Sequence, residues 1–238
     1  MKRIFITFMV IIAIFTYSPA FAETLTIALF DLSGSVLTDN TGNDSKESPY
    51  SRNMAELKYE INKLKRADMI IVIGFGRKSN VTLLKASMPK QAGPMNRNLI
   101  ATREVAVRKL DENIASKVKL VDSSKTDIIG SLFRASRLIS EATLPESTER
   151  KLLIYSDMLD NENIGLSFNK LKNNKVSLQS KAGVPDLRGV EVNIYSAFSD
   201  IKGMSTVQTE AAIKNLKAFW TDYFLKSGSV VKLYRTSY

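Results

Sequence analysis

The chain alternates short apolar runs with segments of helical periodicity, and this alternation constrains its fold more than any other feature. Residues 68–75 are almost continuously apolar, which is typical of a strand that is buried on both faces. Residues 206–226 instead place their apolar side chains at helical spacing. Strands that alternate with helices indicate an α/β fold, with a doubly wound, mostly parallel central sheet and helices on both faces.

The expected elements follow this alternation along the chain. Strands are expected at residues 24–30, 68–75, 81–84, 151–156, 190–197 and 230–234, with a brief extended piece at 118–121. Helices are expected at residues 51–66, 99–118, 126–140, 164–171 and 206–226. The second and third strands are expected to form a hairpin through residues 76–80. No Pro-, Gly- or Ser-rich linker divides the chain, so residues 23–238 are expected to form one domain.

The first residues are expected to be a targeting segment. Lys2 and Arg3 precede an almost wholly apolar run, and the small-residue pattern Ala20-Phe21-Ala22 follows it. This pattern predicts a secretory signal peptide, residues 1–22, which is cleaved before Glu23. An uncleaved membrane anchor is the alternative, although the run is short for a span, and no later segment is long and apolar enough to cross a bilayer. An exported chain without cysteine fits a periplasmic or secreted bacterial protein better than a eukaryotic secretory one.

The composition excludes several kinds of site. The chain has neither histidine nor cysteine, which excludes a Ser-His-Asp triad, a Cys-His pair and the usual zinc sites. Any metal must therefore be held by oxygen, which favours Mg²⁺, Mn²⁺ or Ca²⁺. The formal net charge of +10 is scattered through mixed-charge segments, so nucleic-acid binding is not expected. An anionic envelope or an acidic partner surface fits this charge as well.

Oxygen-bearing side chains follow two of the expected strands. Asp31, Ser33 and Ser35 come at the end of the first strand, and Asp157 comes at the end of the run 151–156. Thr126 stands at the head of an expected helix. Because ligands gather at the carboxyl ends of the strands in such sheets, these side chains are expected to face the same edge. The sequence therefore predicts a site for a divalent cation there.

These residues resemble the metal-ion-dependent adhesion site (MIDAS) of the von Willebrand factor A (vWA) family, in its bacterial exported type. The family motif, Asp-x-Ser-x-Ser followed by Thr and then Asp, is matched in full, and the likeness extends to residues 187–192 and 218–224. The resemblance implies a vWA, Rossmann-like fold in which the hydroxyls of Ser33 and Ser35 contact the metal. It implies that Thr126 binds directly or through water, and that Asp31 and Asp157 act mostly through water.

The resemblance also implies a function. A bound Mg²⁺ (or Mn²⁺ or Ca²⁺) is expected to be completed by an Asp or Glu of another protein, so the chain is expected to be a protein-binding domain and not an enzyme. Its expected role is in an envelope complex for secretion, conjugation or adhesion. The insertion 38–51 is expected to be either a lid or a surface loop. Residues 87–97 are expected near the metal edge, where Lys90 and Arg97 would orient an acidic partner.

Two other interpretations stay open. Residues 28–39 and 155–160 also resemble motifs of haloacid dehalogenase-type phosphatases, in which Asp31 would be the nucleophile. That family has an acid/base Asp where this chain has Ser33, and a serine cannot supply that proton transfer near neutral pH. The other interpretation is a vWA scaffold without a working metal site, in which Ser33 and Ser35 only cap a loop.

Overall fold

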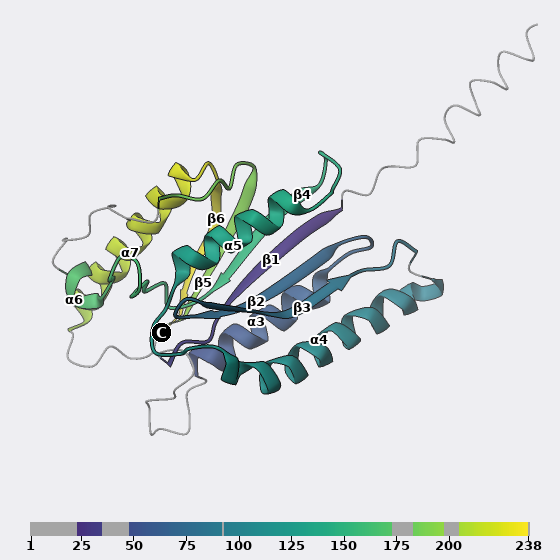
Figure 1. The fold of residues 1–238 in the computed structure, drawn as a ribbon, viewed down its shortest axis with the longest axis horizontal. Helices are drawn as coiled ribbons and strands as arrows, with labels where there is room; N and C mark the ends of the chain where they lie inside the picture. The colour runs from purple at the N-terminus through teal and green to yellow at the C-terminus, as the bar shows by residue number, and fades with distance from the viewer. Residues whose placement is uncertain (1–22, 35–47, 92, 173–182, 198–204, 238) are drawn as a thin grey trace, which may run out of the picture.

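The structure, a computed structural model, describes residues 23–34, 48–91, 93–172, 183–197 and 205–237. These residues build a six-stranded sheet in the order β3-β2-β1-β4-β5-β6, with helices on both faces (Figure 1). The strands are β1 (Thr24–Asp31), β2 (Met69–Gly76), β3 (Ser79–Ser87), β4 (Glu149–Tyr155), β5 (Val190–Ala197) and β6 (Val230–Ser237). The α-helices are α3 (Pro49–Lys63), α4 (Arg97–Lys117), α5 (Ile128–Glu141), α6 (Phe168–Leu171) and α7 (Thr206–Lys226), and two 3-10 turns are η1 (Pro94–Asn96) and η2 (Val118–Leu120). The expected α/β architecture is confirmed.

The sheet direction brings several strand ends to one edge. All neighbouring strands are parallel except β2 and β3, which form the expected antiparallel hairpin. In the central strand β1, Asp31 is level with Phe75 of β2, and Phe30 is level with Tyr155 of β4. The strand order reverses between β1 and β4, which is where ligands bind in doubly wound sheets.

Each face of the sheet is covered by its own helices. Side chains of β1 alternate between the faces, as the two-residue period of a strand requires. Leu25, Ile27 and Leu29 pack in the core under α5 and α7, whereas Ala28 and Phe30 pack in the core under α3 and α4. Figure 1 shows these two helical layers on opposite sides of the sheet. Burial on both faces explains why β1 and β2 are almost continuously apolar.

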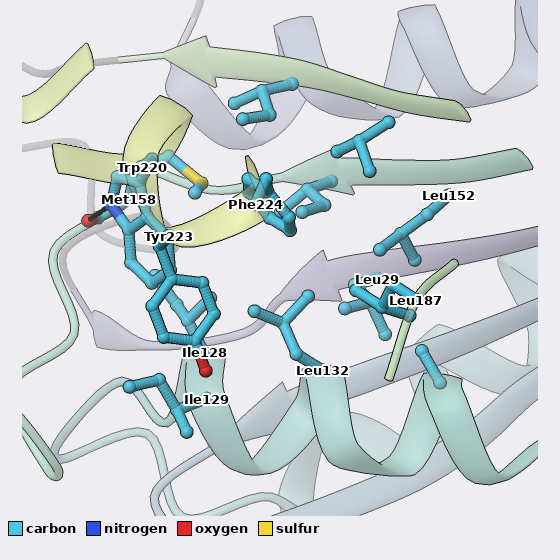
Figure 2. Close-up of a cluster of buried hydrophobic side chains, with 14 of the residues drawn as sticks. Leu29, Ile128, Ile129, Leu132, Leu152, Met158, Leu187, Trp220, Tyr223 and Phe224 are labelled. Carbon is cyan, nitrogen blue, oxygen red and sulfur yellow. Dashed lines mark hydrogen bonds between the residues drawn. The ribbon is translucent and has the colours of Figure 1, made fainter. Parts of the chain in front are cut away.

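Helix α7 also holds the loop that follows β4. Trp220 is fully buried, and its indole Nε1 donates to the Met158 carbonyl oxygen at 2.9 Å. Figure 2 shows Trp220 beside Met158 in this core, with Tyr223 close by. Met158 is itself fully buried and has a φ of 64°, a left-handed conformation that is uncommon for a residue with a side chain. Core packing therefore fixes an unusual backbone turn directly after Asp157.

Two elements differ from the sequence expectation in length or type. The strand expected at residues 81–84 is the longer β3, since the hairpin pairs along the whole length of β2. Residues 118–120 form the turn η2 and not an extended piece, because the chain leaves α4 with helical dihedrals and the Val118 N–H still bonds to the Ile114 carbonyl.

A third expected element is mostly replaced by a turn. Of the helix expected at residues 164–171, only α6 forms. The Asp160 carboxylate accepts from the backbone N–H groups of Asn163 at 2.7 Å and Ile164 at 3.3 Å, and Gly165 has a φ of 61°. A side chain that binds local N–H groups in this way offers the backbone an alternative to a helix.

The edge strand β3 is partly covered by α4. The Asn113 amide donates to the Leu83 carbonyl oxygen at 2.7 Å, and Lys117 Nζ donates to the Thr82 carbonyl oxygen at 2.9 Å. Two acceptors of this strand are thus bound by side chains of the same chain.

Two expectations fall largely outside this description. Residues 1–22, the expected signal peptide, are not among the described residues, and neither are residues 35–47 of the expected insertion. The end of that insertion is helical, because Ser48 caps α3 by accepting from the Ser51 N–H. Among the described residues, no helix has the length and apolar character that a membrane crossing requires.

Substituting Trp220→Phe is expected to lower the free energy of unfolding by about 1–3 kcal/mol, because the buried Met158 carbonyl loses its donor. Leu225→Ala, at an exposed position of the same helix, is the control and should change it by less than about 0.5 kcal/mol. Urea denaturation followed by circular dichroism measures both variants. Wild-type stability in Trp220→Phe would contradict the structural role of this hydrogen bond.

Candidate metal centre

The Asp31 carboxylate at the end of β1 is fixed by hydrogen bonds to both of its oxygens. Its Oδ1 accepts from the Ser33 N–H at 2.8 Å, and its Oδ2 accepts from the Ser156 hydroxyl at 2.6 Å. Ser156 directly follows β4, and its Oγ accepts in turn from the Met158 N–H at 3.0 Å. Sequence reasoning missed Ser156, although its place beside Asp157 at a strand end is the signal that marks it.

Three loops meet at this edge of the sheet and are joined pairwise by hydrogen bonds. Asp31 joins the loop after β1 to the loop after β4 through the Ser156 hydroxyl. Gly34 N–H joins the first loop to the segment before α5 by donating to the Ser123 carbonyl at 2.8 Å. Thr126 joins that segment to the loop after β4, because its carbonyl accepts from the Asn161 N–H at 3.1 Å. The loops therefore form a closed set around the ends of β1 and β4.

Four of the five predicted ligands lie in these loops. Asp31, Ser33, Thr126 and Asp157 are all buried there. The backbone of Asp157 lies next to Ser156, and its Oδ1 accepts from the Leu159 N–H at 2.9 Å. Ser35, the fifth predicted ligand, lies outside the described residues. The structure thus places Asp31, Ser33, Thr126 and Asp157 at the edge where the sequence predicts them.

The two aspartates oppose each other electrostatically. Burial and, second to it, the negative charge of Asp157 raise the pKa of Asp31 from its ordinary value of 3.8 to about 7. The hydrogen bonds from Ser156 and Ser33 act in the opposite direction, because they favour the charged carboxylate. A positive charge between the carboxylates would relieve this repulsion.

Two further buried carboxylates serve the start of α5. Asp127 caps the helix by accepting from the Gly130 N–H at 2.6 Å, and Asp160 accepts from the Ile129 N–H at 2.9 Å. Asn163 joins the two, since its amide donates to Asp127 Oδ1 at 2.7 Å. Burial raises the pKa of Asp160. These carboxylates bind backbone N–H groups at a helix start, so their roles are structural.

A cluster of ion pairs borders the loops. Glu162, in the loop after β4, pairs with Lys78 Nζ at 3.1 Å, Lys125 Nζ at 3.3 Å and Arg77 Nε at 3.4 Å. Hydrogen bonding to Lys78 is the largest of the effects that lower the pKa of Glu162, followed by Lys125. Lys125 directly precedes Thr126, as the sequence shows. Arg77 and Lys78 were missed, although a hairpin after β2 must turn at this same edge.

The described part of the segment 87–97, residues 87–91 and 93–97, lies at the opposite end of the sheet, so its expected place near the metal edge is wrong. β3 is antiparallel to β2, and its last residues therefore return to the amino ends of the parallel strands. Lys90 Nζ lies 3.8 Å from the carboxylate of Glu23, which directly precedes β1. Arg97 begins α4 beyond that turn. Lys90 and Arg97 cannot orient a partner at the metal edge from there.

The donor set of the site suits a hard cation held partly by hydroxyl groups. Within the described part of the chain, no group of three or more His, Cys, Asp or Glu side chains is placed to hold a metal ion. A cation here would instead depend on Asp31 and Asp157 together with the hydroxyls of Ser33 and Thr126. Oxygen-only donors are those that Mg²⁺, Mn²⁺ and Ca²⁺ prefer, so the residues fit such an ion.

The architecture matches what the resemblance to vWA domains implies. The central strand β1 ends in Asp31, the neighbouring β4 is followed by Asp157, and Thr126 lies in the loop that enters α5. The sheet is parallel apart from one antiparallel edge strand. The fold is of the vWA type. The identification of this vWA-type fold rests on the strand order and on where these residues lie.

Comparison with known proteins finds likeness at the level of structure. No family model matches the chain, and no curated protein matches it. The chain is similar to the conserved hypothetical protein BatB from Bacteroides thetaiotaomicron, with 14% identity, coverage of 90% of this chain and 92% of that one, and a TM-score of 0.49. It is also similar to the manganese-loaded TRAP protein of Plasmodium vivax, with 16% identity, coverage of 76% and 59%, and a TM-score of 0.41. For the SpRpn10 VWA domain the identity is 8%, the coverage 89% and 88%, and the TM-score 0.44.

In chelator, raising the pH from about 4 to about 7 is expected to lower the stability of the wild type relative to Asp31→Asn. The unfolded chain loses the Asp31 proton near 3.8, whereas the folded protein keeps it to about 7, so the unfolded state binds fewer protons across this range. Urea denaturation of both proteins at a series of pH values measures the difference. The same pH dependence of the free energy of unfolding in both proteins would contradict the raised pKa of Asp31.

Proposed function

We propose that this chain is a protein-binding domain that engages its partner through a divalent cation, Mg²⁺ or a similar ion. The observation that carries the proposal is the meeting of two buried carboxylates and two buried hydroxyl-bearing side chains at one edge of the sheet. They are Asp31, Asp157, Ser33 and Thr126. Such a set provides oxygen donors but few charges, which leaves a bound cation attractive to a further carboxylate.

The residues of the chain would divide the work of the site. Ser33 and Ser156 hold Asp31 in a fixed orientation, and a bound cation would favour its charged form. Ser33 and Thr126 would hold the ion through their hydroxyls, together with Ser35, and Asp157 would hold it mostly through water. A divalent cation, when bound, supplies positive charge and an open coordination position for an Asp or Glu of the partner.

The contacts of Asp160 speak against the phosphatase alternative. That alternative needs the acidic motif at residues 155–160 to act beside Asp31. Asp160 instead accepts backbone N–H groups of Ile129 and Asn163 at the start of α5. With Ser33 at the acid/base position, Asp31 has no carboxyl group two residues on to transfer a proton. Binding explains the described contacts better than catalysis.

We further propose that the domain acts in a bacterial envelope, in the periplasm or after secretion. The signal-peptide pattern of residues 1–22 and the absence of cysteine support this location. A role in assembling or regulating a secretion, conjugation or adhesion complex follows from this location together with the cation site.

Asp31→Ala and Ser33→Ala are each expected to weaken binding of Mg²⁺ and Mn²⁺ at least about tenfold, because each removes an oxygen donor or its support. Asp122→Asn is the matched control, since this exposed carboxylate lies in the neighbouring loop but outside the donor set. Isothermal titration calorimetry measures the ion affinities, and circular dichroism checks that the variants fold. Equal affinities in all four proteins would leave a metal-free scaffold as the better interpretation.

The wild type and the Asp31→Ala variant can also be used to identify the partner protein. Pull-down from a bacterial envelope extract is expected to recover partners in Mg²⁺ that are lost with chelator and lost in Asp31→Ala. An unchanged set of recovered proteins in chelator would contradict a cation-dependent contact.

A further inference from the structure

Three cationic side chains converge on a single carboxylate beside the candidate metal centre. Arg77 Nε and Lys125 Nζ both contact Glu162 Oε2, at 3.4 and 3.3 Å, and Lys78 Nζ contacts Oε1 at 3.1 Å. Arg77, Lys78 and Lys125 are called the basic cluster below. One negative charge balances only one of its three positive charges, and Asp122 is a further acidic group near Arg77. The cluster and these two acids together keep a positive excess.

The positive charge of the basic cluster faces outward. The Glu162 side chain is only 8% exposed, whereas the exposed fractions are 44% for Arg77, 73% for Lys78 and 45% for Lys125. The anion therefore lies beneath the cations. An approaching partner meets the cationic ends first.

Stability alone gives a weak reason for this arrangement. One cation would balance the charge of the nearly buried Glu162 carboxylate, and three long side chains lose conformational freedom to share it. Like charges held around one carboxylate also repel one another. A second carboxylate arriving from outside would relieve that repulsion, because each cation keeps an exposed face on which to bind it.

The basic cluster adjoins the loops of the candidate metal centre. Lys125 precedes Thr126 in the chain, and the Glu162 N–H donates to the Thr126 carbonyl at 3.3 Å. Arg77 follows β2, whose Phe75 is level with Asp31 and accepts from the Leu32 N–H at 2.8 Å. The Arg77 N–H donates to the Asp122 carbonyl at 2.8 Å, which ties the hairpin turn to the same loop.

We propose that the basic cluster is a second contact for the partner and binds a carboxylate of the same segment whose other acidic residue reaches the cation. This proposal rests on the cation-dependent function proposed above. It specifies the partner segment further: the segment carries at least two acidic side chains, with one for the ion and one for Arg77, Lys78 and Lys125. Charge complementarity of this kind gives specificity and faster association.

The test uses a fluorescent oligo-aspartate peptide as the probe, with a peptide that has one Asp in a glycine background for comparison. Fluorescence anisotropy measures binding of each to the purified protein, in Mg²⁺ and in chelator. The triple variant Arg77→Gln/Lys78→Gln/Lys125→Gln should bind oligo-aspartate about tenfold more weakly in Mg²⁺, and the single-Asp peptide almost as the wild type does. Lys109→Gln, at an exposed position of α4, is the matched control and should bind like the wild type.

Calorimetric titration of Mn²⁺ into the same proteins separates this proposal from the proposed function. Mn²⁺ affinity that is equal to or stronger than that of the wild type in the triple variant, with weakened oligo-aspartate binding, supports the basic cluster as a partner contact, because the removed cations only repel the ion. Mg²⁺-dependent oligo-aspartate binding that is unchanged in the triple variant overturns the cluster proposal and leaves the cation site standing. Oligo-aspartate binding that depends on the cluster but not on Mg²⁺ overturns the shared segment, because the cluster then acts without the ion.

Discussion

The hydrogen bond from the Ser156 hydroxyl to Asp31 is the interaction on which the candidate site depends most. It joins the ends of two neighbouring parallel strands and is made by a fully buried carboxylate. Because an unpartnered buried charge is very unfavourable, this contact fixes both the orientation of Asp31 and the path of the loop after β4. The same loop carries Asp157 and, through Asn161, is tied to Thr126. The Ser156 hydroxyl and the Asn161 N–H together thus couple the three segments that supply the site.

The core supports this edge from below. Met158 connects the site to the core, because its N–H donates to Ser156 and its carbonyl accepts from Trp220 of α7. Its left-handed backbone would be unfavourable in isolation and is held in place by these bonds and by complete burial. The position of Asp157 is therefore set partly by Trp220, although α6 and β5 separate the two residues in the sequence. A precise arrangement of donors at the surface needs this kind of rigid support.

Much of the fold could be predicted from the sequence, because buried parallel strands and amphipathic helices have distinct apolar patterns. The placement of Asp31 and Asp157 follows from the parallel direction of β1 and β4, and that of Thr126 from its position at the start of α5. Direction was also the source of the error at Lys90 and Arg97: the hairpin was expected, but its antiparallel return was not carried through to residues 87–97. Arg77 and Lys78 at the turn were overlooked for the same reason. Ser156 and the roles of Asp127 and Asp160 depend on contacts between distant segments, which periodicity does not report.

Two side chains of α4 that bind the backbone of β3 hinder the addition of another strand at this edge of the sheet. An exposed outer strand offers its unpaired carbonyl and N–H groups as a template on which another chain can add a strand, and this is a common route to aggregates. Asn113 and Lys117 bind the Leu83 and Thr82 carbonyl oxygens, so an added strand would first have to displace them. A second chain would also meet the charge of Lys117 at this edge. The hairpin that turns the basic cluster toward the candidate metal centre thus ends the sheet with a strand on which two carbonyl oxygens already have partners.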